Sequence, residues 1–258
     1  MRYAGLVKAF LLIATLAGLL TAVQPQTPVV LRVGDARINA RALQPYKARW
    51  KETFVDAVNQ VSERGTWDDE LRREPLDGRE VLVRTIVASN PDGSVRESTR
   101  IVVDGTTFAP VRSEWKASGA SYEYHFDGLV IKGVRVSDVG KAPTIIAAQV
   151  WQPMFDYYGG MRELFLATLP RSPGMYTFPA ATATTGAGAL QDSIHWPLVE
   201  VIGDDVTRGA GGKAVKAWRV EANTPYGFYK VWVTSTPPYI ARTVVLLGPG
   251  GRITYELL

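Results

Sequence analysis

The stretch 81-VLVRTIVASNPDGSVRESTRIVVDG-105 decides the fold of this chain. Two runs rich in β-branched residues, 81–88 and 97–103, are each followed by turn-forming residues: Asn-Pro-Asp-Gly at 90–93 and Asp-Gly at 104–105. Short runs of this composition between such turns are typical of β-strands. Because Gly accepts the positive φ of a tight turn, Asp-Gly between two apolar runs predicts antiparallel neighbours.

The same pattern continues to the C-terminus. Asp127-Gly128 again separates two apolar runs, and further strands are expected over the ranges 122–126, 129–136, 196–202, 215–222, 228–234, 240–247 and 253–257. Successive strands joined by short turns are typical of antiparallel sheets. The sequence therefore predicts a mainly β protein with one curved antiparallel sheet.

One helix is expected between the two groups of strands. Apolar residues recur at three- and four-residue spacing from Met154 to Thr168, and Pro170 ends the pattern. Gly159 and Gly160 lie in the middle, and each costs about 1 kcal/mol relative to Ala in a helix. We therefore expect a kink or a break into two short helices.

The range 46–61 fits two structures. Its apolar residues follow the spacing of one helix face: Tyr46, Trp50, Phe54, Ala57 and Val61. The same range also fits a strand over 48–55, a turn at 56–60 and a returning strand over 67–71. Periodicity favours the helix.

Two parts of the chain share a pattern. Ile101-Val102-Val103 with Arg112 is matched at a constant offset by Val231-Trp232-Val233 with Arg242, and each set precedes a further strand and a Gly turn. Two related β-meander halves explain the match, but any β-meander produces some matches of this kind. Both explanations stay open at this point.

The N-terminus has the layout of a secretory signal peptide. Arg2 and Lys8 precede an uncharged run over 9–23. A membrane-spanning helix needs roughly 20 apolar residues, more than this run offers. We therefore expect a cleaved signal peptide over 1–24 and one domain over 25–258, periplasmic or secreted and not membrane-spanning after cleavage.

The composition narrows the possible functions. The chain has no cysteine, which excludes disulfides, thiolate metal sites and the lipidated cysteine of a lipoprotein. Its formal net charge of +4 is spread along the sequence, whereas proteins that bind nucleic acid cluster Lys and Arg, so nucleic acid is not an expected partner. The densest charged run, 63–84, mixes both signs and is expected to be a solvated surface.

Few residues point to catalysis. Alternation along 122–126 places His125 beside Glu123 and away from three aromatic rings, which favours a surface role for this histidine. His195 follows Ser193, but closeness in sequence is not triad geometry, and the common local motifs of hydrolases are absent. We expect no catalytic residue, no metal and no cofactor, and a hydrolase that uses His195 is the weakest hypothesis.

Large aromatic side chains best fit a binding role. Rings with a polar edge can line a pocket for an apolar or amphipathic ligand. The expected lining consists of Tyr122, Tyr124, Phe126, Phe155, Tyr158 and Trp232. The alternative is that these rings fill the core between sheet and helix.

Several motifs resemble those of a family of exported bacterial β-proteins of unknown function. They are Phe155-Asp156, Pro173-Gly174-Met175-Tyr176, Asp104-Gly105 with Pro110-Val111-Arg112, the run 213–220, Trp232-Val233 and Ala241-Arg242. The resemblance covers most of the range 25–258. It implies a half-barrel around one main α-helix, similar to the periplasmic carriers that shield the lipid chains of lipoproteins, with no cofactor. It also favours the hairpin for 46–61, whereas the insert at 180–192, a lid or a loop, departs from the family.

We therefore expect a soluble exported protein that binds a hydrophobic or amphipathic ligand, such as a lipid, in a half-barrel cavity. The second hypothesis is a structural or protein-interaction module of the cell envelope that uses exposed sheet edges. A filled interior together with an exposed apolar patch favours the second hypothesis.

Overall fold

The structure, a computed structural model, describes residues 27–136, 140, 142–181, 194–224 and 227–258. The predicted signal peptide and residues 182–192 of the insert lie outside these residues. One sheet of 15 strands dominates the fold. Its strands in spatial order are β1 (Val29–Val30), β10 (Gly174–Thr177), β13 (Leu198–Arg208), β14 (Ala214–Thr224), β15 (Gly227–Val233), β16 (Ile240–Leu246), β17 (Gly251–Leu257), β2 (Tyr46–Asp56), β3 (Val61–Leu76), β4 (Arg79–Ser89), β5 (Val95–Asp104), β6 (Pro110–Ala117), β7 (Ala120–Asp127), β8 (Val130–Val136) and β9 (Thr144–Gln149).

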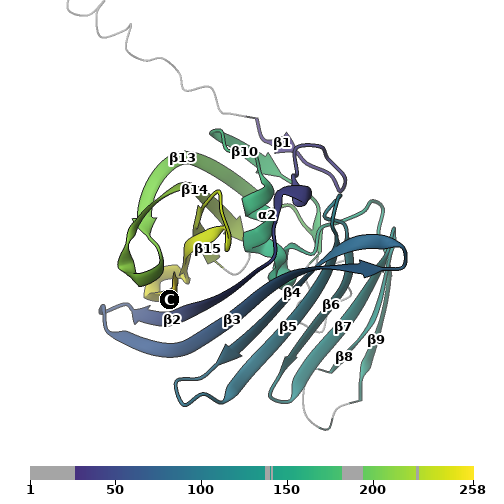
Figure 1. Ribbon diagram of the computed structural model, residues 1–258. Coiled ribbons are helices and arrows are strands. Elements are labelled where there is room, and N and C mark those ends of the chain that lie inside the picture. Colours follow the sequence, from purple (N-terminus) through teal and green to yellow (C-terminus); the bar gives the residue numbers. More distant parts are fainter. Residues whose placement is uncertain (1–26, 137–139, 141, 182–193, 225–226) are drawn as a thin grey trace, which may run out of the picture.

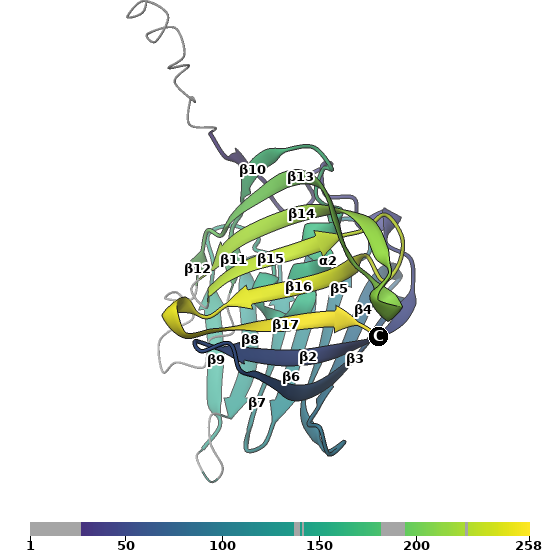
Figure 2. The same ribbon diagram turned by 90° about the vertical axis from the view of Figure 1, so that its left-hand side faces the viewer.

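The sheet is curved and open, and it covers one helix. β1 runs parallel to β10, and the other neighbouring strands of this sheet are antiparallel. In Figure 1, β13, β14 and β15 curve around α2 (Arg162–Thr168), while β4 to β9 lie side by side as a broader wall. Figure 2 shows β13 to β17 and β2 stacked in front of the helix. The predicted mainly β fold, a curved sheet with one main helix, is confirmed.

The range 46–61 forms a hairpin, so the helix is wrong for this stretch. β2 pairs with β3 and, on its other side, with β17. The Asp56 side chain accepts hydrogen bonds from the amides of Val58 and Gln60 and thereby shapes the turn. A spacing of four residues is also a multiple of two, so a helical stripe and one face of a strand place Tyr46 and Trp50 equally well.

The predicted helix is broken in its middle, as its two glycines suggest. Tyr157–Met161 forms one π-helical turn, and α2 follows it. Gly160 has a φ of 108°, which no ordinary side chain favours. The start of the predicted helix is wrong, because Phe155 instead makes a parallel β-bridge with Ala180. Among the described residues, no helix combines the length and apolar character that a membrane span requires.

The two β-meanders share their geometry. Val102 pairs with Arg112 and Trp232 pairs with Arg242, and in both cases the register shifts directly after the pair. The loops that follow are closed by matching backbone hydrogen bonds. The amide of Asp104 donates to the carbonyl oxygen of Ala109 at 2.8 Å, and the amide of Thr234 donates to that of Tyr239 at 2.7 Å. The common bulge and loop closure favour two related halves over a chance match.

The core lies between the curved sheet, α2 and an N-terminal segment over 31–43. Leu164, Phe165 and Leu166 of α2 are at most 1% exposed. Leu31 and Leu43 of the N-terminal segment, 0% and 2% exposed, join the same apolar cluster. The concave side of the sheet is therefore covered by the protein's own side chains.

Candidate functional site

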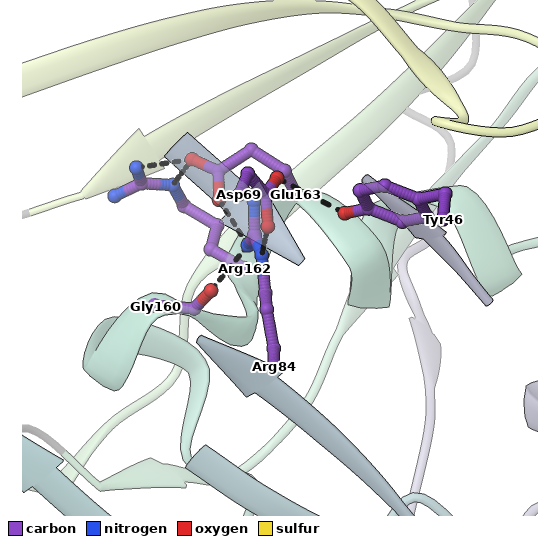
Figure 3. Close-up of polar contacts among 6 residues, drawn as sticks. All are labelled: Tyr46, Asp69, Arg84, Gly160, Arg162 and Glu163. Atoms are coloured by element: carbon purple, nitrogen blue, oxygen red, sulfur yellow. Dashed lines mark hydrogen bonds and ion pairs between the residues drawn. The ribbon is translucent and has the colours of Figure 1, made fainter. Parts of the chain in front are cut away.

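Four charged side chains are buried together between the sheet and α2 (Figure 3). Asp69 comes from β3, Arg84 from β4, and Arg162 and Glu163 from the start of α2. The side chains of Asp69 and Arg84 are only 1% and 5% exposed. The expectation that the charged run 63–84 is a solvated surface is therefore wrong for Asp69 and Arg84, whereas the other charged residues of the run are exposed or half-buried. Two guanidinium groups face two carboxylates, so the formal charges balance.

Arg84 is the centre of this cluster. Its Nε and Nη2 atoms donate to the two carboxylate oxygens of Asp69 at 2.9 and 2.8 Å, which is a bidentate pair. Its Nη1 atom donates to Glu163 Oε2 at 3.1 Å and to the carbonyl oxygen of Gly160. The Arg84 side chain therefore links both the π-helical turn and α2 to the sheet by hydrogen bonds.

Two further side chains complete the hydrogen bonds of the carboxylates. The Tyr46 hydroxyl donates to Asp69 Oδ2 at 3.0 Å. Arg162 Nε donates to Glu163 Oε1 at 3.1 Å, and its guanidinium lies 3.8 Å from the centre of the Tyr229 ring. Each carboxylate thus contacts more than one donor, which offsets the cost of removing it from water.

Arg84 and Glu163 hold their charges across the neutral range. Burial alone raises the pKa of Glu163, but the charges of Arg162 and Arg84 outweigh burial and lower that pKa to about 2. Burial lowers the pKa of Arg84 and the charge of Asp69 raises it, with a net rise well above the ordinary value. Burial also raises the pKa of Tyr46. A general acid or base needs a pKa near the working pH, so the cluster fits a structural ion-pair network.

Little space lies beside these charges. The pocket between Trp50, Trp67, Tyr255 and the Arg84–Glu163 pair has a volume of about 20 Å³. That volume accommodates roughly one water molecule. Among the described residues, the space between these rings and the Arg84–Glu163 pair is therefore too small for a ligand.

The aromatic residues of β7 lie together on the inner face of the sheet. Tyr122 stacks on Tyr124, with ring centroids 4.9 Å apart, and on Trp115 of β6, at 5.7 Å. Tyr124 is 3% exposed, and Phe126 packs against the same small cluster with Met154. Their common face is as predicted, but the segment before the helix covers much of it.

Phe155 and Trp232 of the predicted lining do not join them. Phe155, 1% exposed, belongs to the main core and packs against Phe165 with a centroid distance of 4.8 Å. Trp232 lies on the outer face, where its Nε1 atom donates to Asp205 Oδ2 at 3.0 Å. The side chain of Tyr158 lies outside the described part of the structure. Phe155 and Trp232 thus lie apart from the three aromatic residues of β7.

The two histidines occupy different surroundings. His125 lies on the outer face with its Nε2 atom 2.7 Å from Glu123 Oε1, in agreement with the predicted surface role. His195 belongs to β12 (Ile194–His195) and pairs with Ala180 of β11 (Ala180–Ala181), whereas Ser193 lies outside the described residues. Within the described ranges, no group of three or more potential metal-binding side chains occurs.

Two surface features that sequence reasoning missed are better candidates for binding. The first is the outer edge of β9, whose strand Thr-Ile-Ile-Ala-Ala-Gln contains no charge and no proline. The second is a cleft of about 570 Å³ at the C-terminal end of α2, between residues 36–43 and the loop 235–239. The uncharged run 144–149 was visible in the sequence, but its position at an edge was not.

Three comparisons bear on the identity of the chain. The resemblance to an exported bacterial family stays a prediction, because no protein-family model, no curated protein and no solved structure matches this chain.

Proposed function

We propose that this chain is an exported interaction module of the cell envelope that binds an extended segment of another polypeptide along the β9 edge. The observation that carries the proposal is an uncharged, apolar edge strand at the end of a 15-stranded sheet. Natural proteins usually protect such edges with charges, prolines, bulges or very short strands. The opposite edge follows that rule, because β1 has only two residues.

The backbone of β9 is suited to strand addition. The amide of Val150, just after β9, donates to the carbonyl oxygen of Leu129 at 2.8 Å, toward β8. Backbone groups alternate in direction along a strand. The N–H and C=O groups of Ile145, Ala147 and Gln149 therefore face away from β8, where a further antiparallel strand would pair with them.

The side chains beside this edge favour an apolar partner. Ile145 is 73% exposed and pairs directly with Val134, which is 40% exposed. The two side chains form an apolar pair on the outer face at the rim of the sheet. An added strand with apolar residues at alternate positions would cover both of them.

The test replaces Ile145 with lysine. A charge at the edge should abolish co-purification of the bound polypeptide from the exported fraction, while the free energy of unfolding changes by less than about 0.5 kcal/mol. The matched control is Val58→Lys, because Val58 is 72% exposed at the distant β2–β3 turn. Hydrogen exchange then reports the bound edge, since the amides of Ile145, Ala147 and Gln149 should be slowed in the complex.

Equal capture by the Ile145→Lys and Val58→Lys variants would contradict the proposal. Unchanged exchange of the β9 amides in the complex would contradict it as well. A dimer of the chain that Ile145→Lys dissociates would identify a second copy as the polypeptide that occupies the edge.

Binding of an amphipathic ligand remains the second candidate function, at the cleft beside α2 rather than inside the sheet. The cleft volume of about 570 Å³ lies in the range of small-molecule pockets, roughly 300–1,000 Å³. Its apolar lining residues are Leu43, Leu169 and Tyr239, which are at most 5% exposed. Arg171 donates to the carbonyl oxygen of Thr234 at 3.3 Å and lies 4.7 Å from the centre of the Trp218 ring. In the described part of the chain it pairs with no carboxylate, which leaves its charge to an anionic head group.

Native mass spectrometry of protein from the exported fraction tests this second candidate. We expect a co-purifying amphipathic anion, and at least tenfold weaker binding of a fluorescent fatty acid by Arg171→Gln, because a hydrogen bond to a charged group contributes about 1.5–3 kcal/mol. Arg49→Gln, on the exposed face of β2, serves as control. A ligand-free protein that binds no fatty acid would exclude this candidate.

A further inference from the structure

The two related meanders carry the same polar pair on their outer faces. In the second meander, Asp205 and Arg242 flank the position of Trp232. The register identifies the matching residues of the first meander, because Val102 pairs with Arg112 as Trp232 pairs with Arg242.

The matching carboxylate is found by following the register across the sheet. Trp232 pairs with Arg219, and two residues earlier Ala217 pairs with Asp205. In the first meander Val102 pairs with Val83, and two residues earlier Val81 pairs with Glu74. Glu74 therefore occupies the position of Asp205.

In the second meander, the indole ring of Trp232 lies between this carboxylate and the guanidinium. The Trp232 Nε1 atom donates to Asp205 Oδ2 at 3.0 Å, and the Arg242 guanidinium lies 5.5 Å from the ring centre. Such an arrangement combines a cation–π contact with a charge-assisted hydrogen bond. Below the ring, Ala217 is only 3% exposed.

The first meander has a cleft in the same place. The residue that corresponds to Trp232 is Val102, and a cleft of about 270 Å³ opens above it. Val81, Val83 and Val102 form an apolar floor with at most 2% exposure, and the tip of the β3–β4 hairpin at 74–77 lies along one side. Glu74 and Arg112 both line the cleft.

The guanidinium is held in a similar way in both halves. Arg112 pairs with Glu114 and Glu123, both at 3.0 Å, and Arg242 pairs with Glu256 at 3.3 Å. These carboxylates fix each guanidinium beside the central position. The first meander therefore keeps the carboxylate and the guanidinium of the second and lacks the ring. Its floor is more apolar, because Val81 and Val83 stand where the second meander has Ala217 and Arg219.

We infer that this outer-face cleft is a binding site for a planar aromatic group with an N–H donor, of the indole class. The ring would lie on the valine floor beside the Arg112 guanidinium and donate its N–H hydrogen to the Glu74 carboxylate. A volume of about 270 Å³ suits one ring system better than a lipid chain, since drug-sized pockets begin at roughly 300 Å³. Both a free indole compound and a tryptophan side chain of a polypeptide have this chemistry.

The first test is a titration with indole, followed by NMR shifts and calorimetry on the full chain. The wild-type protein should bind one indole. Val102→Trp should fill the cleft from within and weaken binding at least tenfold. Trp232→Val should open the matching position in the second meander and raise the stoichiometry from one to two.

A second pair of measurements examines the hydrogen bond without disturbing the fold. Replacing Glu74 with glutamine, at a half-buried position of β3 where it pairs with Arg72 at 3.3 Å, should weaken indole binding about tenfold, because a charge-assisted hydrogen bond is lost. N-methylindole, which has no donor, should bind the wild-type protein as weakly as indole binds Glu74→Gln.

The outcomes separate clearly. No indole binding by the folded wild-type protein, or unchanged binding by a folded Val102→Trp or Glu74→Gln variant, would overturn the inference. Tighter binding of N-acetyltryptophanamide than of indole would identify a polypeptide as the source of the ring, and the reverse order would identify a free small molecule.

Discussion

Replacing Arg84 with methionine should lower the free energy of unfolding by about 3–5 kcal/mol, the usual cost of removing one partner from a buried ion pair. Asp69 and Glu163 would lose the guanidinium that they share in the core. The Gly160 carbonyl would also lose its donor. Urea denaturation followed by tryptophan fluorescence and circular dichroism measures the change.

The matched control is Arg49→Met on β2. Arg49 pairs with Asp68 at 3.5 Å, but the two side chains are 60% and 54% exposed, so this variant should lose less than about 1 kcal/mol. Similar losses of unfolding free energy for the two variants would show that Arg84 stabilises the fold no more than an exposed ion pair does. The ion-pair cluster would then not be what holds α2 against the sheet.

Much of the sheet could be predicted from the sequence because its strands are locally encoded. The predicted ranges 81–88 and 97–103 lie inside β4 and β5. By contrast, β9 was not predicted, because it has no flanking hairpin signal. The charged and aromatic residues of β6 carry a weak strand signal, and this strand was expected only from the match between the two meanders. Whether such a segment forms a strand depends on packing against the neighbouring strands more than on its own composition.

The buried charges could not be predicted, because they depend on contacts between distant parts of the chain. Arg84 and Asp69 are 15 residues apart, and Arg84 and Glu163 are 79 apart. In the sequence, Asp69 stands between Asp68 and Glu70, which reads as a solvated acidic run. Alternation along β3 turns only the middle carboxylate inward, where it is 3% exposed.

The predicted lining failed to converge for a related reason. Alternation correctly grouped Tyr122, Tyr124 and Phe126 on one face of β7. Trp232 could not be assigned to a face without its neighbours, and the core takes Val231 and Val233, at 0% and 2% exposure. The ring that seemed suited to a pocket therefore lies on the opposite face.

Replacing Gly160 with alanine should lower the free energy of unfolding by about 2–4 kcal/mol, because a positive φ costs a side chain about 1–2 kcal/mol and a steric clash adds to it. Gly160 has a φ of 108°, and a Cβ atom there would lie 2.8 Å from Ile101 Cδ1. Relief of the clash requires a shift of the buried Ile101 side chain or of the helical turn, whose carbonyl accepts a hydrogen bond from Arg84. Urea denaturation gives the loss, and hydrogen exchange of the α2 amides shows whether the helix loosens first.

Gly93→Ala separates the two causes. Gly93 has a φ of 85° and nothing within 4 Å of the added Cβ, so only the backbone cost of about 1–2 kcal/mol is expected there. A larger loss at Gly160, accompanied by faster exchange of the α2 amides, would assign the difference to the close packing of the turn against β5. If both variants lost the same free energy, the contact with Ile101 would be too soft to position the turn, and Arg84 alone would hold the helix against the sheet.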